Sequence, residues 1–293
     1  MRATSKAAFF SLARAGRAAL QWRLLLLWAG CLLLPSTLLA LPLWRILGAS
    51  FDHSVHAAAL ARELDLSTIA DLVANINRNG ASVPTAAAQA LIATLLLSPL
   101  LSGMAMSAAR AVQPQRFGAL IGGAVQEYPR MARMLMVALI PLGLAAGLGG
   151  ALIAAAGNYG NTALLESDAE AAHLLAVLGA VLLMTLAHAT IDGARAALAL
   201  DRRRRSAAGA WWDGCKLLAR RPFATLGVYL AVTAAALMVA APLSLARIHL
   251  PHVSVAAFLG AFLLTQLIVM TFAWMRIARL FAMLALAQSP RAP

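Results

Sequence analysis

Three ionisable side chains stand close together inside one long apolar stretch of the sequence. His188 and Asp192 are four residues apart, and Arg195 follows three residues later. On an α-helix these spacings place the three side chains on one face. Ionisable groups at membrane depth are costly and often serve proton relays or ion sites. The structural alternative is that Asp192 pairs with Arg195 or Arg276 at the interface, while His188 hydrogen-bonds to a neighbouring helix.

Gln266 lies in the middle of a second apolar stretch with few polar neighbours in the sequence. Its amide must find a partner across the helix assembly, where such hydrogen bonds contribute about 0.6–2 kcal/mol. The residue therefore acts either as an interhelical hydrogen-bonding group or as part of a transport path. We take a candidate intramembrane polar site, without a catalytic role, to consist of His188, Asp192, Arg195 and Gln266.

The densest group of basic residues is interleaved with tryptophan and lies between two apolar stretches. Anionic lipid headgroups attract Lys and Arg at about 1 kcal/mol each near the surface, and Trp suits the boundary between water and hydrocarbon. The group therefore predicts anchoring to an anionic lipid surface, and no nucleic-acid partner is expected. We call it the basic patch; its members are Arg202, Arg203, Arg204, Arg205, Trp211, Trp212, Lys216, Arg220 and Arg221.

Motifs for enzyme and cofactor chemistry are absent from the sequence. It has no phosphate-binding loop, no Gly-x-Ser-x-Gly elbow, no His-Glu-x-x-His helix and no Cys-x-x-Cys pair. The two cysteines, Cys31 and Cys215, are far apart and indicate no disulfide framework. We therefore expect no enzyme activity, no cofactor and no metal site. Five histidines fall on the predicted non-cytoplasmic side, where imidazole could bind zinc or copper but nothing in the sequence fixes the residues together: His53, His56, His173, His249 and His252.

The composition of the whole chain indicates that lipid is its solvent. Of the 293 residues, 62% are apolar and 12% charged, against about 45–50% and about 25% in soluble domains. Six apolar runs are each long enough to cross about 30 Å of hydrocarbon as a helix. The sequence thus predicts an all-α integral membrane protein, a six-transmembrane-helix bundle. The predicted spans are 24–47, 84–109, 134–156, 174–192, 223–245 and 253–274.

The basic residues also predict how the chain is oriented. Of the 24 Lys and Arg residues, only Arg45, Arg62, Arg78 and Arg247 fall on one side of the predicted spans. Basic residues concentrate on the cytoplasmic side of membrane proteins. We therefore expect a multi-pass protein of the bacterial inner membrane, with both its N- and C-termini in the cytoplasm.

A spacing shared by three parts of the chain predicts an internal repeat. Gly16 and Arg23, Gly123 and Arg130, and Gly214 and Arg221 are each seven residues apart, and each Arg precedes an odd-numbered span. A stretch with helical apolar spacing precedes each Gly and is typical of an interfacial amphipathic helix. The even-numbered spans end in Ala109-Arg110, Ala194-Arg195 and Ala278-Arg279.

Together these patterns predict one membrane domain, 1–293, made of three units at about 5–110, 114–200 and 204–287. Each unit is an amphipathic helix on the inner leaflet followed by a transmembrane hairpin. Repeated units within one bundle favour pseudo-threefold packing.

Several short motifs carry a resemblance to known membrane proteins. They are Asp192-Gly-Ala-Arg195, Leu200-Asp201-Arg202-Arg203, Ala210-Trp211, Gly214, Leu217-Leu218 and Arg220-Arg221-Pro222, with Gln266, Trp274, Arg276 and Arg279 in the last span. The chain resembles uncharacterised six-span bacterial proteins, the YciC-like proteins, and the membrane domain fused to some glycerophosphoryl diester phosphodiesterases. The resemblance implies a six-span fold over nearly the whole chain, and no activity is carried over from it.

Two functions fit the sequence. The first is a non-enzymatic protein that organises membrane lipids, anionic ones above all, or a partner membrane protein. The second is a small-molecule or lipid transporter whose path runs between the three units and is lined by His188, Asp192 and Gln266. Transporters are often built from repeats, which favours the second function, whereas the three basic interfacial segments favour the first.

Overall fold

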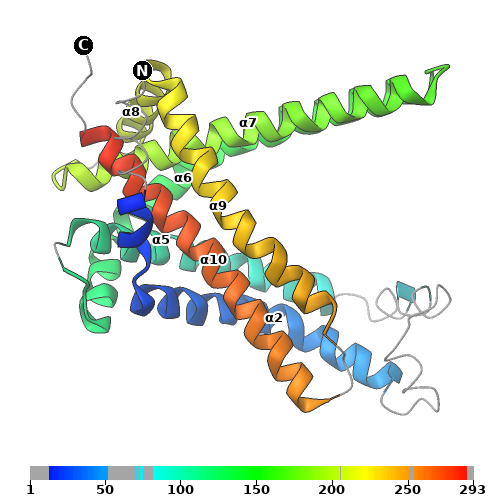
Figure 1. Ribbon diagram of the computed structural model, residues 1–293, viewed down its shortest axis with the longest axis horizontal. Helices are drawn as coiled ribbons and strands as arrows, with labels where there is room; N and C mark the ends of the chain where they lie inside the picture. Colours follow the sequence, from blue (N-terminus) through cyan, green and yellow to red (C-terminus); the bar gives the residue numbers. More distant parts are fainter. Residues whose placement is uncertain are drawn as a thin grey trace.

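The computed structural model consists of helices joined by short connections in the part of the chain that it describes (Figure 1). No strand occurs among these residues. The described residues are 13–51, 70, 73–74, 82–111, 113–204, 206–250 and 254–288.

Six of the helices are long and apolar enough to cross a membrane, and each contains almost all of one predicted span. The shortest has 27 residues, or about 40 Å of helix, which exceeds the hydrocarbon thickness of about 30 Å. The predicted all-α six-span class is therefore confirmed, and the chain is a multi-pass membrane protein. These helices are α2 (Trp22–Phe51), α5 (Ser82–Arg110), α6 (Phe117–Gly160), α7 (Glu166–Leu200), α9 (Pro222–Ile248) and α10 (Val255–Gln288).

The segments predicted to be interfacial join their spans in three different ways. Residues 13–19 form a short helix, and the non-helical residues 20–21 separate it from α2. Helix α6, in contrast, runs without a break through Pro129 from the predicted interfacial stretch into the span, which is tolerated where other groups satisfy the freed carbonyl. In the third case a single residue, Arg221, separates the end of α8 (Ala207–Arg220) from Pro222, which begins α9, because proline suits the first turn of a new helix.

Helix α8 presents one face to its neighbours and the other to its surroundings. Ala207, Ala210 and Gly214 are buried at a helical spacing, whereas the Trp212 side chain is largely exposed. Ser206 caps the helix, since its side chain accepts a hydrogen bond of 3.1 Å from the backbone N–H of Gly209.

The buried core gathers at one end of the long helices, which we call the basic end because Arg23, Arg110, Arg130, Arg195, Arg221 and Arg279 lie there. One buried cluster brings together Leu24, Met104, Leu120 and Ile277, and another brings together Met106, Met134 and Leu198. Away from this end burial is sparse: only 6% of the most apolar window of α10 is buried. The helices therefore form a packed bundle at the basic end only.

From the basic end the hairpins diverge (Figure 1). Helix α7 projects to the upper right of the view, whereas α9 and α10 run together toward the lower right. Far from the core, packing joins the two helices of a hairpin: a Cβ added at Gly149 of α6 would lie 2.9 Å from Cβ of Ala180 on α7. In the other hairpin, Nε of Arg247 on α9 donates to Oγ1 of Thr265 on α10 at 2.9 Å.

Candidate functional site

A cavity of about 180 Å³ lies where five helices, α2, α5, α6, α7 and α10, meet near the basic end. Its polar lining residues are Thr94, Ser98, Ser102, Asp192, Arg195 and Arg276. The other lining residues are Trp28, Leu32, Leu95, Leu101, Ala105, Met106, Met131 and Leu280. Polar and ionisable groups at this depth are expensive, so their convergence on one cavity marks a candidate functional site.

Asp192 and Arg195 form an ion pair in the wall of this cavity. Nη1 of Arg195 lies 3.1 Å from Oδ1 of Asp192, and the Asp192 side chain is 12% exposed. Both residues are on α7, three positions apart, so the helix itself sets the pairing geometry. The carboxylate is thus compensated by one guanidinium from its own helix.

Arg276 of α10 adds a second guanidinium to the same cavity. Its side chain is exposed, and it makes no hydrogen bond or ion pair with the described residues. The lining therefore contains two guanidinium groups and one carboxylate, which leaves the cavity with a positive charge. In the sequence analysis Arg276 was an alternative partner of Asp192, whereas Asp192 pairs with Arg195 in the structure.

Three hydroxyl side chains form a stripe along one wall, which the sequence analysis missed. Thr94, Ser98 and Ser102 follow one another at intervals of four on α5, an interval that places side chains on the same helical face. Oγ1 of Thr94 donates to the carbonyl of Ala90 at 2.7 Å. The regular spacing of small hydroxyl residues within span 84–109 was a signal that could have identified this wall.

Trp28 of α2 contributes a hydrogen-bond donor without a partner. The residue is 4% exposed and lines the cavity. Its indole N–H finds no acceptor among the described residues, although buried polar groups are nearly always satisfied. This donor could not be identified from the sequence, because the location of Trp28 depends on how α2 packs against α5.

Two of the four residues of the predicted intramembrane site do not line the cavity: His188 and Gln266. Nδ1 of His188 is 2.9 Å from the carbonyl oxygen of Met184, four residues earlier on its own helix, so the expected bond to a neighbouring helix is wrong for this nitrogen. Gln266 precedes Arg276 by ten residues on α10, about 15 Å along the helix. Asp192 and Arg195 are the members that the structure brings together.

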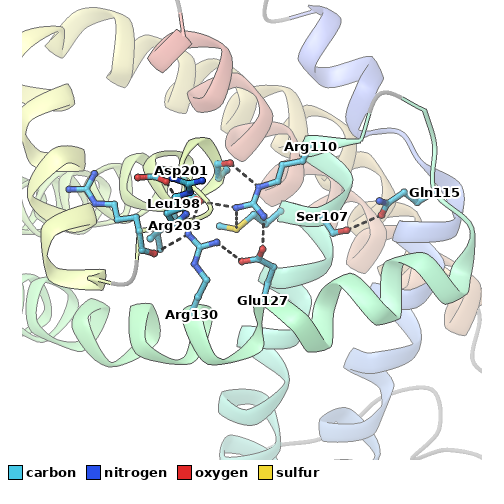
Figure 2. Close-up of polar contacts among 11 residues, drawn as sticks. Ser107, Arg110, Gln115, Glu127, Arg130, Leu198, Asp201 and Arg203 are labelled. Atoms are coloured by element: carbon cyan, nitrogen blue, oxygen red, sulfur yellow. Dashed lines mark hydrogen bonds and ion pairs between the residues drawn. The ribbon is translucent and has the colours of Figure 1, made fainter.

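A second polar cluster closes the basic end of α7 (Figure 2). Glu127 of α6 pairs with Arg110, the last residue of α5, at 2.5 Å and with Arg130 at 2.8 Å. These three side chains are 12–13% exposed. One carboxylate therefore holds two guanidinium groups in a largely buried position.

The two arginines donate to the last carbonyl groups of α7 and to the following turn (Figure 2). Arg110 donates to Leu198 O and Ala199 O at 2.8 Å each. Arg130 donates to Leu198 O at 3.1 Å and to Asp201 O at 2.7 Å. Terminal carbonyls lack partners within their helix, and cations favour that end of the helix dipole. This cluster is a helix cap, and it fixes the chain that leads into the basic patch.

The basic patch is partly neutralised by Asp213 of α8. This carboxylate pairs with Arg204 and, at 3.6 Å, with Nζ of Lys216. Trp211 turns inward, and its indole N–H donates to Oγ1 of Thr190 at 3.2 Å, whereas Trp212 remains 59% exposed. Arg205 lies outside the described residues. The exposed part of the patch thus combines an aromatic ring with two exposed arginines, Arg202 and Arg203, whose side chains form no ion pair with the described residues.

No group of three His, Cys, Asp or Glu side chains that could hold a metal ion occurs in the part of the chain that the structure describes. His53, His56 and His252 lie outside that part. Comparison with protein-family models, curated proteins and solved structures finds no match. The fold and the site therefore define a class: a multi-pass α-helical membrane protein with a positively charged cavity near the basic end of its helices.

Proposed function

We propose that this protein is a non-enzymatic protein of the bacterial inner membrane that binds anionic lipid at its basic end and so organises lipid or a partner membrane protein there. The observation that carries the proposal is the coincidence of two positive features at that end. One is the cavity with Arg195 and Arg276, and the other is the exposed part of the basic patch. Basic pockets and basic segments beside membrane spans are the features that recognise anionic headgroups.

Three close contacts support the proposed division of the chain into three units. A Cβ at Gly16 would lie 3.5 Å from the Trp274 ring of α10, one at Gly123 would lie 2.6 Å from Cβ of Ser107 of α5, and one at Gly214 would lie 2.7 Å from N of Ala194 of α7. Gly123 and Gly214 thus each meet the even-numbered span of the preceding unit. Gly16, which belongs to the first unit, meets the even-numbered span of the last unit.

This cyclic order is what pseudo-threefold packing requires. It agrees with the proposed repeat boundaries and with the six-span architecture that the resemblance to YciC-like proteins implies. Because each unit packs on its predecessor at the basic end, the three units together enclose the space in which the cavity lies.

The proposed orientation can be tested with the cysteines of the chain. In a Cys31→Ser variant Cys215 of α8 is the remaining thiol, and it should react with a membrane-impermeant maleimide in inverted membrane vesicles but not in intact cells. Burial raises the pKa of the Cys215 thiol, so less of the reactive thiolate is present at neutral pH than in an exposed cysteine. The labelling rate should therefore keep increasing as the pH is raised beyond the usual pKa range of a cysteine thiol. Labelling of intact cells would contradict a cytoplasmic basic end.

The lipid-anchoring role of the basic patch can be tested by charge removal. Replacement of Arg202 and Arg203 by Gln should reduce the phosphatidylglycerol that copurifies with the protein, since each exposed Arg contributes about 1 kcal/mol of attraction. Lipid analysis of the purified protein by mass spectrometry measures the change. The matched control replaces Arg45 and Arg247, at the opposite ends of α2 and α9. Equal lipid loss in both variants would contradict the proposal.

A transport function is the second candidate, and the polar cavity favours it. A transport path, however, must cross the whole membrane. The lining of the cavity on α5 ends at Thr94, 12 residues or about 18 Å short of the beginning of the helix at Ser82. Without His188 and Gln266, two of the three residues expected along the path are missing from the lining. Lipid binding therefore accounts for more of the geometry.

A further inference from the structure

We infer that the cavity between α2, α5, α6, α7 and α10 is a binding site for a phosphate-type oxyanion, supplied by the headgroup of an anionic phospholipid. Its principal ligands are the guanidinium groups of Arg195 and Arg276, which both line the cavity. This inference rests on the proposed lipid-binding function and adds the location of the site and the chemistry of the ligand.

The charge balance of the cavity favours an anion. Asp192 is the one acidic side chain in its lining, and it is already paired with Nη1 of Arg195 at 3.1 Å. A guanidinium carries five N–H donors, so most of those of Arg195 stay free for a ligand. Arg276 makes no hydrogen bond or ion pair within the described chain. Guanidinium groups match phosphate oxygens in geometry as well as in charge.

The neutral groups of the lining extend this set of donors. The Trp28 indole N–H is buried without an acceptor among the described residues, and it can only donate. Ser98 and Ser102 add hydroxyl groups that rotate to suit their partner. A phosphate presents only acceptor oxygens, so it would satisfy both guanidinium groups together. The shielded Trp28 N–H would reach it after a turn of the indole ring toward the cavity. A cation would find a single carboxylate that is already paired.

The size and depth of the cavity indicate that a headgroup, and not a whole solute, occupies it. Its volume of about 180 Å³ is below the roughly 300–1,000 Å³ of ordinary small-molecule pockets. Arg195 lies five residues, about 8 Å along the helix, before the end of α7 at Leu200, which is close to the headgroup layer. Leu32 and Leu95 line the same cavity, and they provide apolar surface for the acyl chains that a lipid brings with it.

Lipid titration of the full-length protein in detergent tests the site. Native mass spectrometry should detect phosphatidylglycerol bound to wild type, with about tenfold or more weaker binding in Arg276→Gln, because a charge-assisted hydrogen bond is lost. Arg116→Gln is the matched control, since Arg116 is exposed at the same end and does not line the cavity. Trp28→Phe keeps an aromatic ring but removes the five-membered ring that carries the N–H, so it should weaken binding even if Arg276→Gln fails to fold.

Further binding measurements distinguish a lipid headgroup from free phosphate as the ligand. They also distinguish failure of the cavity site from failure of the proposed lipid-binding function. Phosphatidylcholine, which has no net charge, should bind more weakly than phosphatidylglycerol, and inorganic phosphate should compete only at far higher concentration. If inorganic phosphate binds as tightly as the lipid, the lipid source is wrong. If the Arg276 and Trp28 variants bind phosphatidylglycerol like wild type while the Arg202 and Arg203 variant does not, the cavity site is wrong and the proposed function survives. If wild type does not prefer phosphatidylglycerol to phosphatidylcholine, both are wrong.

Discussion

Replacement of Glu127 by Ala is expected to destabilise the protein by about 3–5 kcal/mol, the usual cost of removing one partner from a buried ion pair. Glu127 lies between Arg110 and Arg130, and all three side chains are 12–13% exposed. Without the carboxylate, two guanidinium groups would face each other in a poorly solvated place. Their hold on the carbonyl groups at the end of α7 would then weaken.

The midpoint of thermal unfolding in detergent measures this effect, and we expect a decrease on the order of 10 °C. Glu166→Ala is the control, because Glu166 is an exposed acid in the first turn of the same α7. Its loss should cost about 0.3–1 kcal/mol of helix-dipole interaction. Glu127→Gln should fall between the two, since it keeps hydrogen-bonding capacity but removes the charge. Equal midpoints for the two alanine variants would show that the cluster does not stabilise the fold.

Replacement of Gly214 by Ala is expected to separate α8 from α7 and to destabilise the protein by about 1–3 kcal/mol or more. The added methyl group would lie 2.7 Å from the backbone N of Ala194 and still closer to the carbonyl oxygen of Thr190. Both obstacles are backbone atoms of α7, so no side-chain rotation can make room. The hydrogen bond from Trp211 to Thr190 should be lost as the helices move apart.

Gly122→Ala is the matched control for this substitution. Gly122 lies inside α6, and an added methyl group there meets no atom within 4 Å. Alanine is a better helix former than glycine by about 0.8–1.0 kcal/mol, so this variant should be as stable as wild type or slightly more stable. The two substitutions should therefore shift the unfolding midpoint in opposite directions. A shift in the same direction would mean that the contact between Gly214 and α7 is looser than the structure indicates.

Those features of the fold that depend on local pattern were predictable from the sequence. Each span is an apolar run long enough to cross a bilayer, and such a run forms a helix because it must satisfy its own backbone in lipid. The pairing of Asp192 with Arg195 was one of the two arrangements expected, since a spacing of three suffices on a helix. The ends of the helices were less predictable: α6 begins at Phe117, because its interfacial stretch continues directly into the span.

The polar groupings that depend on contacts between helices were not predictable. Glu127 drew no notice in the sequence, where Arg110 and Arg130 were read as markers of orientation, and their joint role at the end of α7 follows from the packing of α5 and α6. Arg276 and Trp28 are far apart in the chain, yet both line the same cavity. Gln266 was selected because it is polar within an apolar run, yet it lies about 15 Å along α10 from Arg276 and does not line the cavity.

The confinement of the buried core to the basic end gives the molecule one anchored end and one compliant end. The outer halves of the hairpins are held by contacts such as that of Gly149 with Ala180, which join two helices of one hairpin and leave the hairpins independent of one another. A pulling force applied between Gly160 and Glu166, where α6 turns into α7, would therefore extract this pair as a unit. Lateral tension in the bilayer would alter the spread of the hairpin tips while the anchored end kept its shape.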